Sequence, residues 1–250
     1  MKFTVLGGKG LIGSQVVDLL SAAGHEVVAA SLSTGVDVVS GKGLDEAFAG
    51  ADVAVNLTNS PTFDASSIEF FETSAAAIGA AADAAGIRHQ VILSIVGVDQ
   101  VPGLDYYRAK AAQENALVNG PTPYSIVRAT QFYEFVDAIM SWTSDGDIVR
   151  LPPTPVQPMA AADVAAAVAG TASGPPLQGI RNVGGPEVFS LDELGRITLG
   201  ARPDGRRVVT DDQAGMFAAV PGDVLTAPDG ADLGPTYYRD WLEGEKQQHP

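Results

Sequence analysis

The sequence predicts an α/β protein in which helices cover both faces of a doubly wound parallel β-sheet. Short apolar segments alternate with longer segments that place apolar residues at helical spacing. The short segments are continuously apolar, as in strands that are buried on both faces. Glycine or proline closes most segments, and the rhythm suits β-α-β units joined by right-handed crossovers.

The regular elements are expected in a simple alternation over the first part of the chain. A strand over residues 3–6 ends at Gly7, and a helix over residues 11–23 ends at Gly24. Further strands are expected over residues 26–30, 36–39, 52–57, 90–96 and 124–128. Further helices are expected over residues 44–48, 68–85, 106–118 and 132–142.

The alternation becomes less regular after about residue 145, where several prolines lie close together. A helix over residues 160–172, a strand over 179–183 and a helix over 191–199 are expected there. The remainder is rich in loops and ends on an amphipathic segment that contains Tyr237, Tyr238, Trp241 and Leu242. We therefore expect one domain, with a core over residues 1–145, which the glycine-rich turn described below marks as dinucleotide-binding, and a small appendage over 146–250 that completes a substrate pocket.

Composition and charge exclude several classes of protein. The chain has no Cys, which excludes a disulfide scaffold, a thiolate metal site and a Cys nucleophile. A net charge of -15 disfavours nucleic acid and anionic membrane surfaces as partners. No segment approaches the ~20 apolar residues of a membrane helix, and the N-terminus does not resemble a signal peptide, so we expect a cytoplasmic protein. His25, His89 and His249 lack ligand spacing, and no metal site is expected.

A glycine-rich turn joins the first strand to the first helix, with the sequence Gly7-Gly8-Lys9-Gly10-Leu11-Ile12-Gly13. Gly7 permits a tight turn, Gly10 lets the backbone approach a pyrophosphate, and Gly13 lets the helix pack closely against the sheet. Free N–H groups at the start of the helix, around Leu11 and Ile12, would then meet the phosphates. The strand–turn–helix context indicates a Rossmann-type dinucleotide-binding site.

The end of the second strand bears on the choice between NAD and NADP. No acidic residue lies within residues 27–36, where a protein that prefers NAD usually holds the ribose hydroxyls with Asp or Glu. Ser31, Ser33 and Thr34 could instead donate to a 2′-phosphate, and Lys9 could reach it as a point charge. A solvated Lys9 beside a polar turn would explain the same residues. We expect NADP(H) to be preferred over NAD(H).

Tyr106 and Lys110 form a Tyr-x-x-x-Lys pattern in a predicted helix. At this spacing the two side chains share a face, and a nearby ammonium lowers the pKa of a phenol towards neutrality. Tyr106 could then act as a general acid towards a carbonyl that receives hydride, with Ser94 holding the carbonyl oxygen. Tyr107, three residues before Lys110, competes for this role. The Tyr-x-x-x-Lys spacing also arises by chance on surface helices.

Three further features leave alternatives open. Asn59 follows a strand at the expected binding edge and could touch the ribose or nicotinamide, or could belong to a polar turn. Arg128 ends a strand and could form a structural ion pair. An aromatic stripe could belong to the core or to a substrate wall, and it contains Phe132, Tyr133, Phe135, Met140 and Trp142.

Taken together, these motifs resemble the short-chain dehydrogenase/reductase superfamily, and most closely its atypical, NmrA-like NAD(P)-binding branch. The resemblance rests on the glycine turn, Ser94, Tyr106-x-x-x-Lys110 and residues 124–128, and it extends to about Gly200. It implies a Rossmann sheet, NAD(P) binding and a substrate cleft under the C-terminal part. Lys9 departs from the family pattern, in which small or polar residues are usual at that position.

We therefore expect an oxidoreductase that uses NADPH to reduce a carbonyl or quinone-like small molecule, with a hydrophobic or aromatic substrate. Tyr106 would donate the proton, Lys110 would lower the pKa of Tyr106 and hold the ribose, and Ser94 would orient the oxygen. Two alternatives stay open: a non-catalytic redox-sensing regulator, as NmrA-like proteins can be, and a nucleotide-sugar epimerase or dehydratase. The Ala-rich helices could also pair two copies into a homodimer, or pack only on their own sheet.

Overall fold

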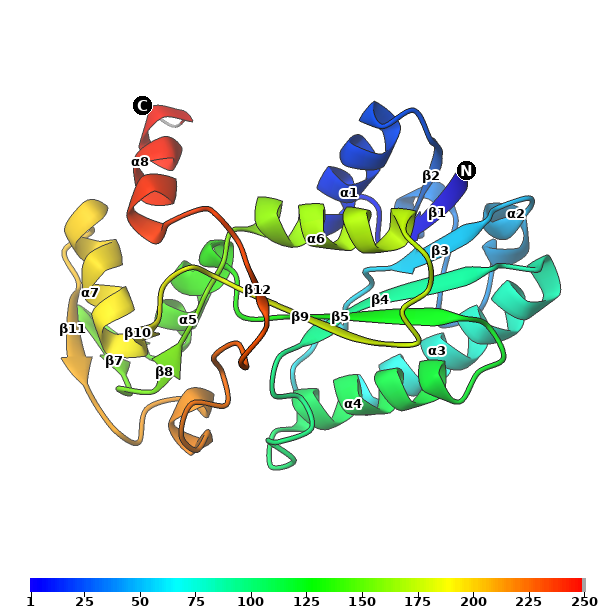
Figure 1. The fold of residues 1–250 in the computed structure, drawn as a ribbon. Helices are drawn as coiled ribbons and strands as arrows, with labels where there is room; N and C mark the ends of the chain where they lie inside the picture. Colours follow the sequence, from blue (N-terminus) through cyan, green and yellow to red (C-terminus); the bar gives the residue numbers. More distant parts are fainter. Residues whose placement is uncertain (249–250) are drawn as a thin grey trace. The chain divides into compact units, whose positions relative to one another are not determined.

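The computed structural model describes residues 1–248, which form two compact units (Figure 1). The first unit comprises Met1–Arg128 and Val164–Arg181, and the second comprises Ala129–Asp163 and the chain from Asn182 onwards. His249, which was considered as a metal ligand, lies outside the described residues. The expectation that residues 146–250 complete a substrate pocket stays a prediction.

A parallel sheet forms the centre of the fold, with its seven strands in the order β12-β9-β5-β4-β3-β1-β2. In chain order the strands are Lys2–Leu6 (β1), Glu26–Ala30 (β2), Val53–Asn56 (β3), His89–Ile95 (β4), Tyr124–Ala129 (β5), Gly179–Gly184 (β9) and Asp232–Leu233 (β12). β1 pairs in parallel with both β2 and β3, so the chain winds outwards from β1 in both directions. The predicted doubly wound parallel sheet is confirmed. Ligands bind at such a reversal of strand order, beyond the carboxyl ends of the strands.

Helices cover both faces of the sheet in the first unit (Figure 1). α3 (Ser66–Ala85) and α4 (Asp105–Val118) pack against one another on one face, and α1 (Leu11–Ala22) and α6 (Ala161–Ser173) lie on the other. The strands between them are buried on both sides, which explains their continuously apolar sequences.

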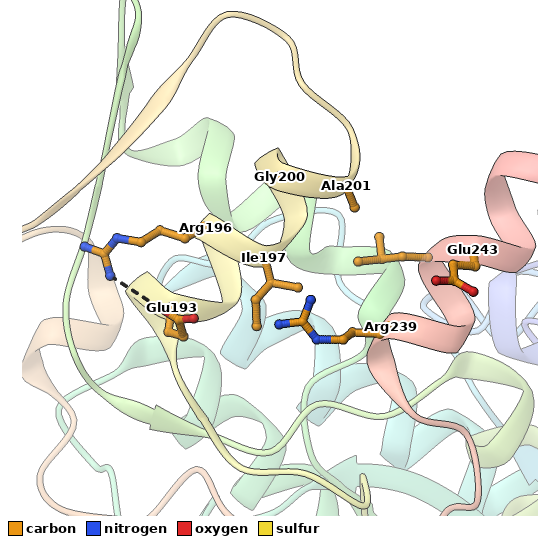
Figure 2. Close-up of a pocket in the computed structure, with 8 residues that line it drawn as sticks. Glu193, Arg196, Ile197, Gly200, Ala201, Arg239 and Glu243 are labelled. Carbon is orange, nitrogen blue, oxygen red and sulfur yellow. Dashed lines mark ion pairs between the residues drawn. The ribbon is translucent and has the colours of Figure 1, made fainter.

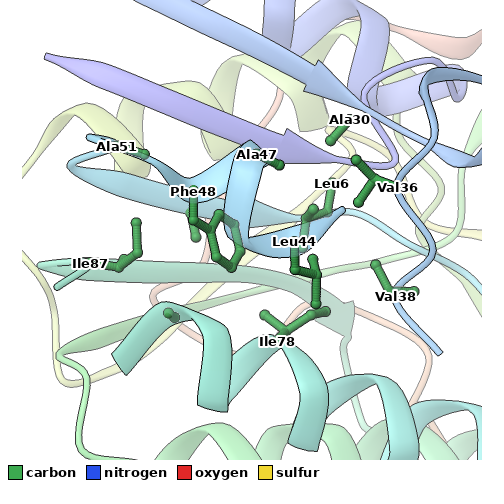
Figure 3. Packing of buried hydrophobic residues seen from close by; sticks show 12 residues of the cluster. Leu6, Ala30, Val36, Val38, Leu44, Ala47, Phe48, Ala51, Ile78 and Ile87 are labelled. Atoms are coloured by element: carbon green, nitrogen blue, oxygen red, sulfur yellow. The ribbon is translucent and has the colours of Figure 1, made fainter. Parts of the chain in front are cut away.

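The segment over residues 36–39 is not a strand, contrary to expectation. Val36 and Val38 are buried nonetheless, in the apolar cluster that also contains α2 (Leu44–Phe48) and that Figure 3 shows. The Asp37 carboxylate accepts hydrogen bonds from the backbone N–H two residues later, at 2.9 Å, and from the Ser40 hydroxyl, at 2.7 Å. These bonds fold the backbone into a turn, so the two valines reach the core without pairing to a neighbouring strand.

The second unit contains a small sheet that the sequence analysis missed. β11 (Arg207–Thr210) pairs in parallel with β7 (Ile148–Leu151), which pairs antiparallel with β6 (Ser144–Asp145). These strands are short and are brought together from distant parts of the chain, so no local pattern marks them. The other elements of this unit are η2 (Tyr133–Phe135), α5 (Val136–Trp142), β8 (Pro155–Val156), β10 (Phe189–Ser190), α7 (Leu191–Ala201), η3 (Met216–Ala219) and α8 (Tyr238–Gln248).

Two of the three histidines lie in the first unit, in different surroundings. The His25 ring lies 4.9 Å from the ring of Phe3, and the His89 Nε2 atom lies 2.8 Å from the Ser125 hydroxyl. Over residues 1–248, His, Asp and Glu side chains do not gather in threes as metal ligands would. Within the same residues, no helix is both long enough and apolar enough to cross a bilayer.

Candidate functional site

The turn between β1 and α1 is packed so closely that Gly7, Gly8 and Gly13 have no room for a side chain. Gly7 has a φ of +76°, and a Cβ on Gly7 would lie 2.8 Å from the carbonyl oxygen of Leu57. A Cβ on Gly13 would lie only 2.1 Å from the carbonyl oxygen of Gly7. A Cβ on Gly8 would lie 2.9 Å from the Cα atom of Ala29 in β2. The turn is therefore a cradle of backbone, held against β2, the end of β3 and the start of α1.

The start of α1 supplies hydrogen-bond donors to this cradle. Gly10 occupies the N-cap position, and no side chain in the described part of the chain caps the helix there. The N–H groups of Leu11, Ile12 and Gly13 have no carbonyl one turn earlier to accept from them, and the helix dipole adds partial positive charge. Gly10 and Leu11 are exposed. This arrangement would fit the pyrophosphate of a dinucleotide, and binding at these residues stays a prediction.

Three hydroxyl groups gather beside the cradle, in the turn that follows β2. The Ser31 and Ser33 hydroxyl oxygens lie 2.8 Å apart, and the Thr34 hydroxyl oxygen accepts a hydrogen bond from the Ser31 N–H at 2.8 Å. Leu6 of β1 is in register with the last residue of β2, so the hydroxyl turn and the glycine turn begin side by side. Lys9 is exposed on the glycine turn. The structure thus brings the four residues proposed for the 2′-phosphate to one end of two adjacent strands.

Ser94 lies near the carboxyl end of β4 and is 3% exposed. Its hydroxyl group has no hydrogen-bond partner among the described residues. Buried hydroxyl groups without a partner are uncommon in folded proteins, because leaving the group unpaired costs free energy. The Ser94 hydroxyl is thus unpaired but also buried, and its contact with the oxygen of a substrate stays a prediction.

Tyr106 lies in the first turn of α4, where its hydroxyl group donates a hydrogen bond to the side-chain oxygen of Asn59. The rings of Phe63 and Phe71 lie 4.9 Å and 5.9 Å from the Tyr106 ring, measured between centroids. Burial raises the pKa of the Tyr106 phenol to about 12, and the Asn59 carboxamide opposes this shift. The expectation that this pKa is lowered towards neutrality is wrong, because desolvation outweighs every favourable contact of the phenolate.

Lys110 is buried, and its ammonium group is engaged with partners other than Tyr106. Its Nζ atom donates to the carbonyl oxygen of Leu93 at 2.7 Å and to Gln113 Oε1 at 2.5 Å. The Nζ atom also lies 4.7 Å from the centre of the Phe71 ring. Burial lowers the pKa of Lys110 to about 7, although the Glu114 carboxylate favours the charged form. The acceptors at offsets three and four were visible in the sequence as competitors for this ammonium.

Arg128 forms the structural ion pair that was considered for it. Its guanidinium donates to both carboxylate oxygens of Glu114, at 2.6 and 2.9 Å, and lies 3.1 Å from Asp99. Tyr107, the competitor of Tyr106, is 4% exposed and belongs to the buried face of α4. Tyr106 is only partly buried, so it is the tyrosine of this pair that a ligand can reach.

A pocket of about 480 Å³ lies in the second unit, between α7 and α8 (Figure 2). Arg196 at its edge is already paired with Asp192 at 2.8 Å and lies 3.9 Å from Glu193. Its lining residues are Glu193, Arg196, Ile197, Gly200, Ala201, Arg239, Leu242 and Glu243. None of the residues predicted as catalytic or cofactor-binding belongs to this lining, so the candidate site remains the sheet edge of the first unit.

Comparisons with known proteins show the family to which the chain belongs. A family model described as NAD(P)H-binding matches residues 7–175, which begin at the first glycine of the turn. The chain is 30% identical over 208 residues to (4-alkanoyl-5-oxo-2,5-dihydrofuran-3-yl)methyl phosphate reductase from Streptomyces griseus subsp. griseus. That alignment covers 76% of this chain and 70% of the relative.

Several solved structures share the fold. The dTDP-4-dehydrorhamnose reductase from Bacillus anthracis in complex with NADP has a TM-score of 0.78 at 14% identity, over 100% of this chain and 99% of that chain. The UDP-glucose 4-epimerase from Thermus thermophilus complexed with NAD has a TM-score of 0.70 at 19% identity, over 98% and 93%. The triphenylmethane reductase from Citrobacter sp. complexed with NADP(H) has a TM-score of 0.64 at 19% identity, over 84% and 79%. The chain belongs to the NAD(P)H-binding family, as its sequence resemblance implied, and it shares its fold with these solved reductases and epimerases.

Proposed function

We propose that this protein is an NAD(P)H-dependent reductase of a carbonyl or quinone-like small molecule, with NADPH as the preferred cofactor. The observation that carries the proposal is the backbone cradle at Gly7–Gly13, which has no room for a side chain at Gly7, Gly8 or Gly13 and presents uncapped helix N–H groups. Family membership and the similarity to a reductase support the same activity.

The cofactor, when bound, supplies hydride to the carbonyl carbon of the substrate. The N–H groups at the start of α1 bind the pyrophosphate and thereby fix the cofactor against the sheet edge. The Ser94 hydroxyl donates a hydrogen bond to the carbonyl oxygen, and Tyr106 gives that oxygen its proton. An alkoxide is more basic than a phenolate, so a phenol with a raised pKa can still transfer its proton. Lys110 holds the carbonyl of Leu93, next to Ser94, and so positions the end of β4.

The preference for NADPH rests on the hydroxyl groups of Ser31, Ser33 and Thr34 and on the exposed Lys9; the Thr34 hydroxyl, which donates to the Ser31 carbonyl oxygen at 2.9 Å, would have to exchange that bond for the phosphate. A 2′-phosphate carries negative charge and several acceptor oxygens, which suits hydroxyl donors and an ammonium group. A carboxylate in the same place would repel the 2′-phosphate, and residues 27–36 contain none.

The preference for an apolar substrate rests on Phe63, which is 43% exposed and packs beside Tyr106. An exposed aromatic ring next to the proton donor offers a face to a flat or aliphatic ligand. The Streptomyces relative is named for an alkanoyl-substituted dihydrofuranyl methyl phosphate. A molecule of that type, with an apolar chain on a small carbonyl ring, belongs in the substrate panel.

A second candidate function is a dinucleotide sensor without turnover. One observation favours it: the ammonium of Lys110 is committed to Leu93 and Gln113 and does not contact the Tyr106 phenol. An NmrA-like regulator binds the cofactor and needs no proton donor.

The two functions are separated by following the nicotinamide absorbance with NADPH and NADH against a panel of ketones, enones, quinones and alkanoyl lactones. We expect NADPH oxidation with at least one of them. Tyr106→Phe should lower the rate by about 10²–10⁴-fold with NADPH affinity unchanged, because it removes only the proton donor. Tyr107→Phe, in the same helix, should retain turnover. Full turnover by Tyr106→Phe would contradict the assigned role, and binding without turnover across the panel would favour the sensor.

A further inference from the structure

The hydroxyl group of Tyr106 has a partner that the Tyr-x-x-x-Lys pattern does not indicate. Asn59 lies three residues beyond β3, in the loop at the carboxyl edge of the sheet. Its side-chain oxygen accepts the hydrogen bond of the Tyr106 hydroxyl group, across 47 positions of sequence. The Phe63 and Phe71 rings pack against the ring of Tyr106. The Tyr106 ring thus packs against aromatic rings, and its hydroxyl group is hydrogen-bonded to a carboxamide.

The neighbouring cations are committed elsewhere. Lys110 donates to Leu93 and Gln113, and Arg108 is paired with Asp105, also donating to the carbonyl of Pro102 at 2.9 Å. The group that the structure places in hydrogen-bond contact with the reactive oxygen is therefore a neutral amide.

We propose that Asn59, rather than Lys110, is the positioning residue for Tyr106 in the reduction proposed above, on which this inference rests. The carboxamide accepts the phenol O–H in the resting protein and donates its NH₂ group to the phenolate once the proton has left. An amide suits both states because it carries an acceptor and two donors. This replaces the expected contact of Asn59 with the ribose or nicotinamide.

The proton balance is simple. Hydride adds to the carbonyl carbon, the O–H bond of Tyr106 breaks, and a new O–H bond forms on the substrate oxygen. The phenolate left behind is hydrogen-bonded by Asn59 until water returns a proton to it. Asn59 itself neither gains nor loses a proton, so its effect acts entirely through Tyr106.

The inference is tested on four proteins: the unmodified chain, Asn59→Leu, Tyr106→Phe and the double variant. The contact is read by NMR with the ring carbon that bears the Tyr106 hydroxyl group labelled, and NADPH affinity is read by calorimetry. Turnover is compared in H₂O and D₂O. Asn115→Leu, on the exposed face of α4, is the control.

We expect Asn59→Leu to shift the Tyr106 carbon resonance and to lower kcat by about tenfold. The solvent isotope effect on kcat should increase, NADPH affinity should stay within about twofold, and the double variant should be no slower than Tyr106→Phe alone. An unmoved Tyr106 resonance would overturn the inference. Loss of NADPH affinity on Asn59→Leu, both in the unmodified chain and in Tyr106→Phe, would also overturn the inference, because Asn59 would then contact the dinucleotide. If the unmodified chain reduces nothing, the proposed function fails, while the NMR result still decides the contact.

Discussion

The glycine turn after β1 is formed by backbone groups, whereas the cluster around Tyr106 is formed by side chains. In the turn, the donors are backbone N–H groups, and their places are enforced by contacts such as the 2.1 Å that a Gly13 Cβ would make with Gly7. Around Tyr106, long side chains have several hydrogen-bond partners within reach. Lys110 donates hydrogen bonds to the Leu93 carbonyl and to Gln113, and Tyr106 donates one to Asn59. Steric exclusion fixes the first region locally, whereas competition among neighbours decides the second.

The largest effect is expected when a single methyl group is added to the glycine turn. Gly13→Ala places a Cβ against the Gly7 carbonyl, so α1 must move away from the sheet. We expect a loss of about 1–3 kcal/mol in the free energy of unfolding from overpacking. Displacement of the N–H donors should weaken dinucleotide affinity by on the order of a hundredfold, about 2.7 kcal/mol. Denaturant unfolding and calorimetry measure the two effects.

Gly79→Ala is the matched control, because a Cβ on Gly79 in α3 meets nothing within 4 Å. It should leave dinucleotide binding unchanged and stabilise the protein by up to ~1 kcal/mol, since alanine is the better helix former. If Gly13→Ala binds as tightly as Gly79→Ala, the turn is not the phosphate cradle.

A smaller effect tests the side-chain region. Burial lowers the pKa of Lys110 from 10.5 to about 7 in the folded protein, so the unfolded chain holds this proton more tightly between these values. The stability of the protein should therefore fall as the pH is lowered from 10.5 to 7, and this contribution should change no further below pH 7. Lys110→Met removes this dependence and should be the more stable protein at pH 7. Its free energy of unfolding minus that of the unmodified chain should be larger at pH 7 than at pH 10, by on the order of 2–4 kcal/mol.

Urea unfolding of Lys110→Met and of the unmodified chain across this pH range measures the difference. Lys42→Met, at an exposed lysine, retains Lys110 and should keep the pH dependence of the unmodified chain. An equal pH dependence in Lys110→Met and the unmodified chain would mean that Lys110 is not desolvated in the folded protein.

The order of strands and helices in the first unit was predictable, because each element is marked by its own apolar run and its closing glycine. The roles of Gly7 and Gly13 were predictable for the same reason. The turn at residues 36–39 was missed because buried valines occur in turns as well as in strands. β7 and β11 were missed because their pairing joins distant segments.

The Tyr-x-x-x-Lys pattern predicted Lys110 as the partner of the Tyr106 phenol, whereas the hydroxyl group donates to Asn59. Helical spacing places Lys110 on the same face as Tyr106, but it does the same for Glu114 and Gln113 relative to Lys110. Asn59 comes from another loop, so its contact depends on how β3 and α4 are placed. Such a contact follows from tertiary packing and not from spacing along the chain.

The proposed reduction requires that the first β-α-β unit binds a nicotinamide dinucleotide. Calorimetric titration of the unmodified protein with NADPH and with NADH tests it most directly. We expect saturable binding of both, with NADPH the tighter ligand because of Lys9, Ser31, Ser33 and Thr34. Titrations in which neither dinucleotide releases or absorbs heat, with no displacement of one by the other, would contradict it.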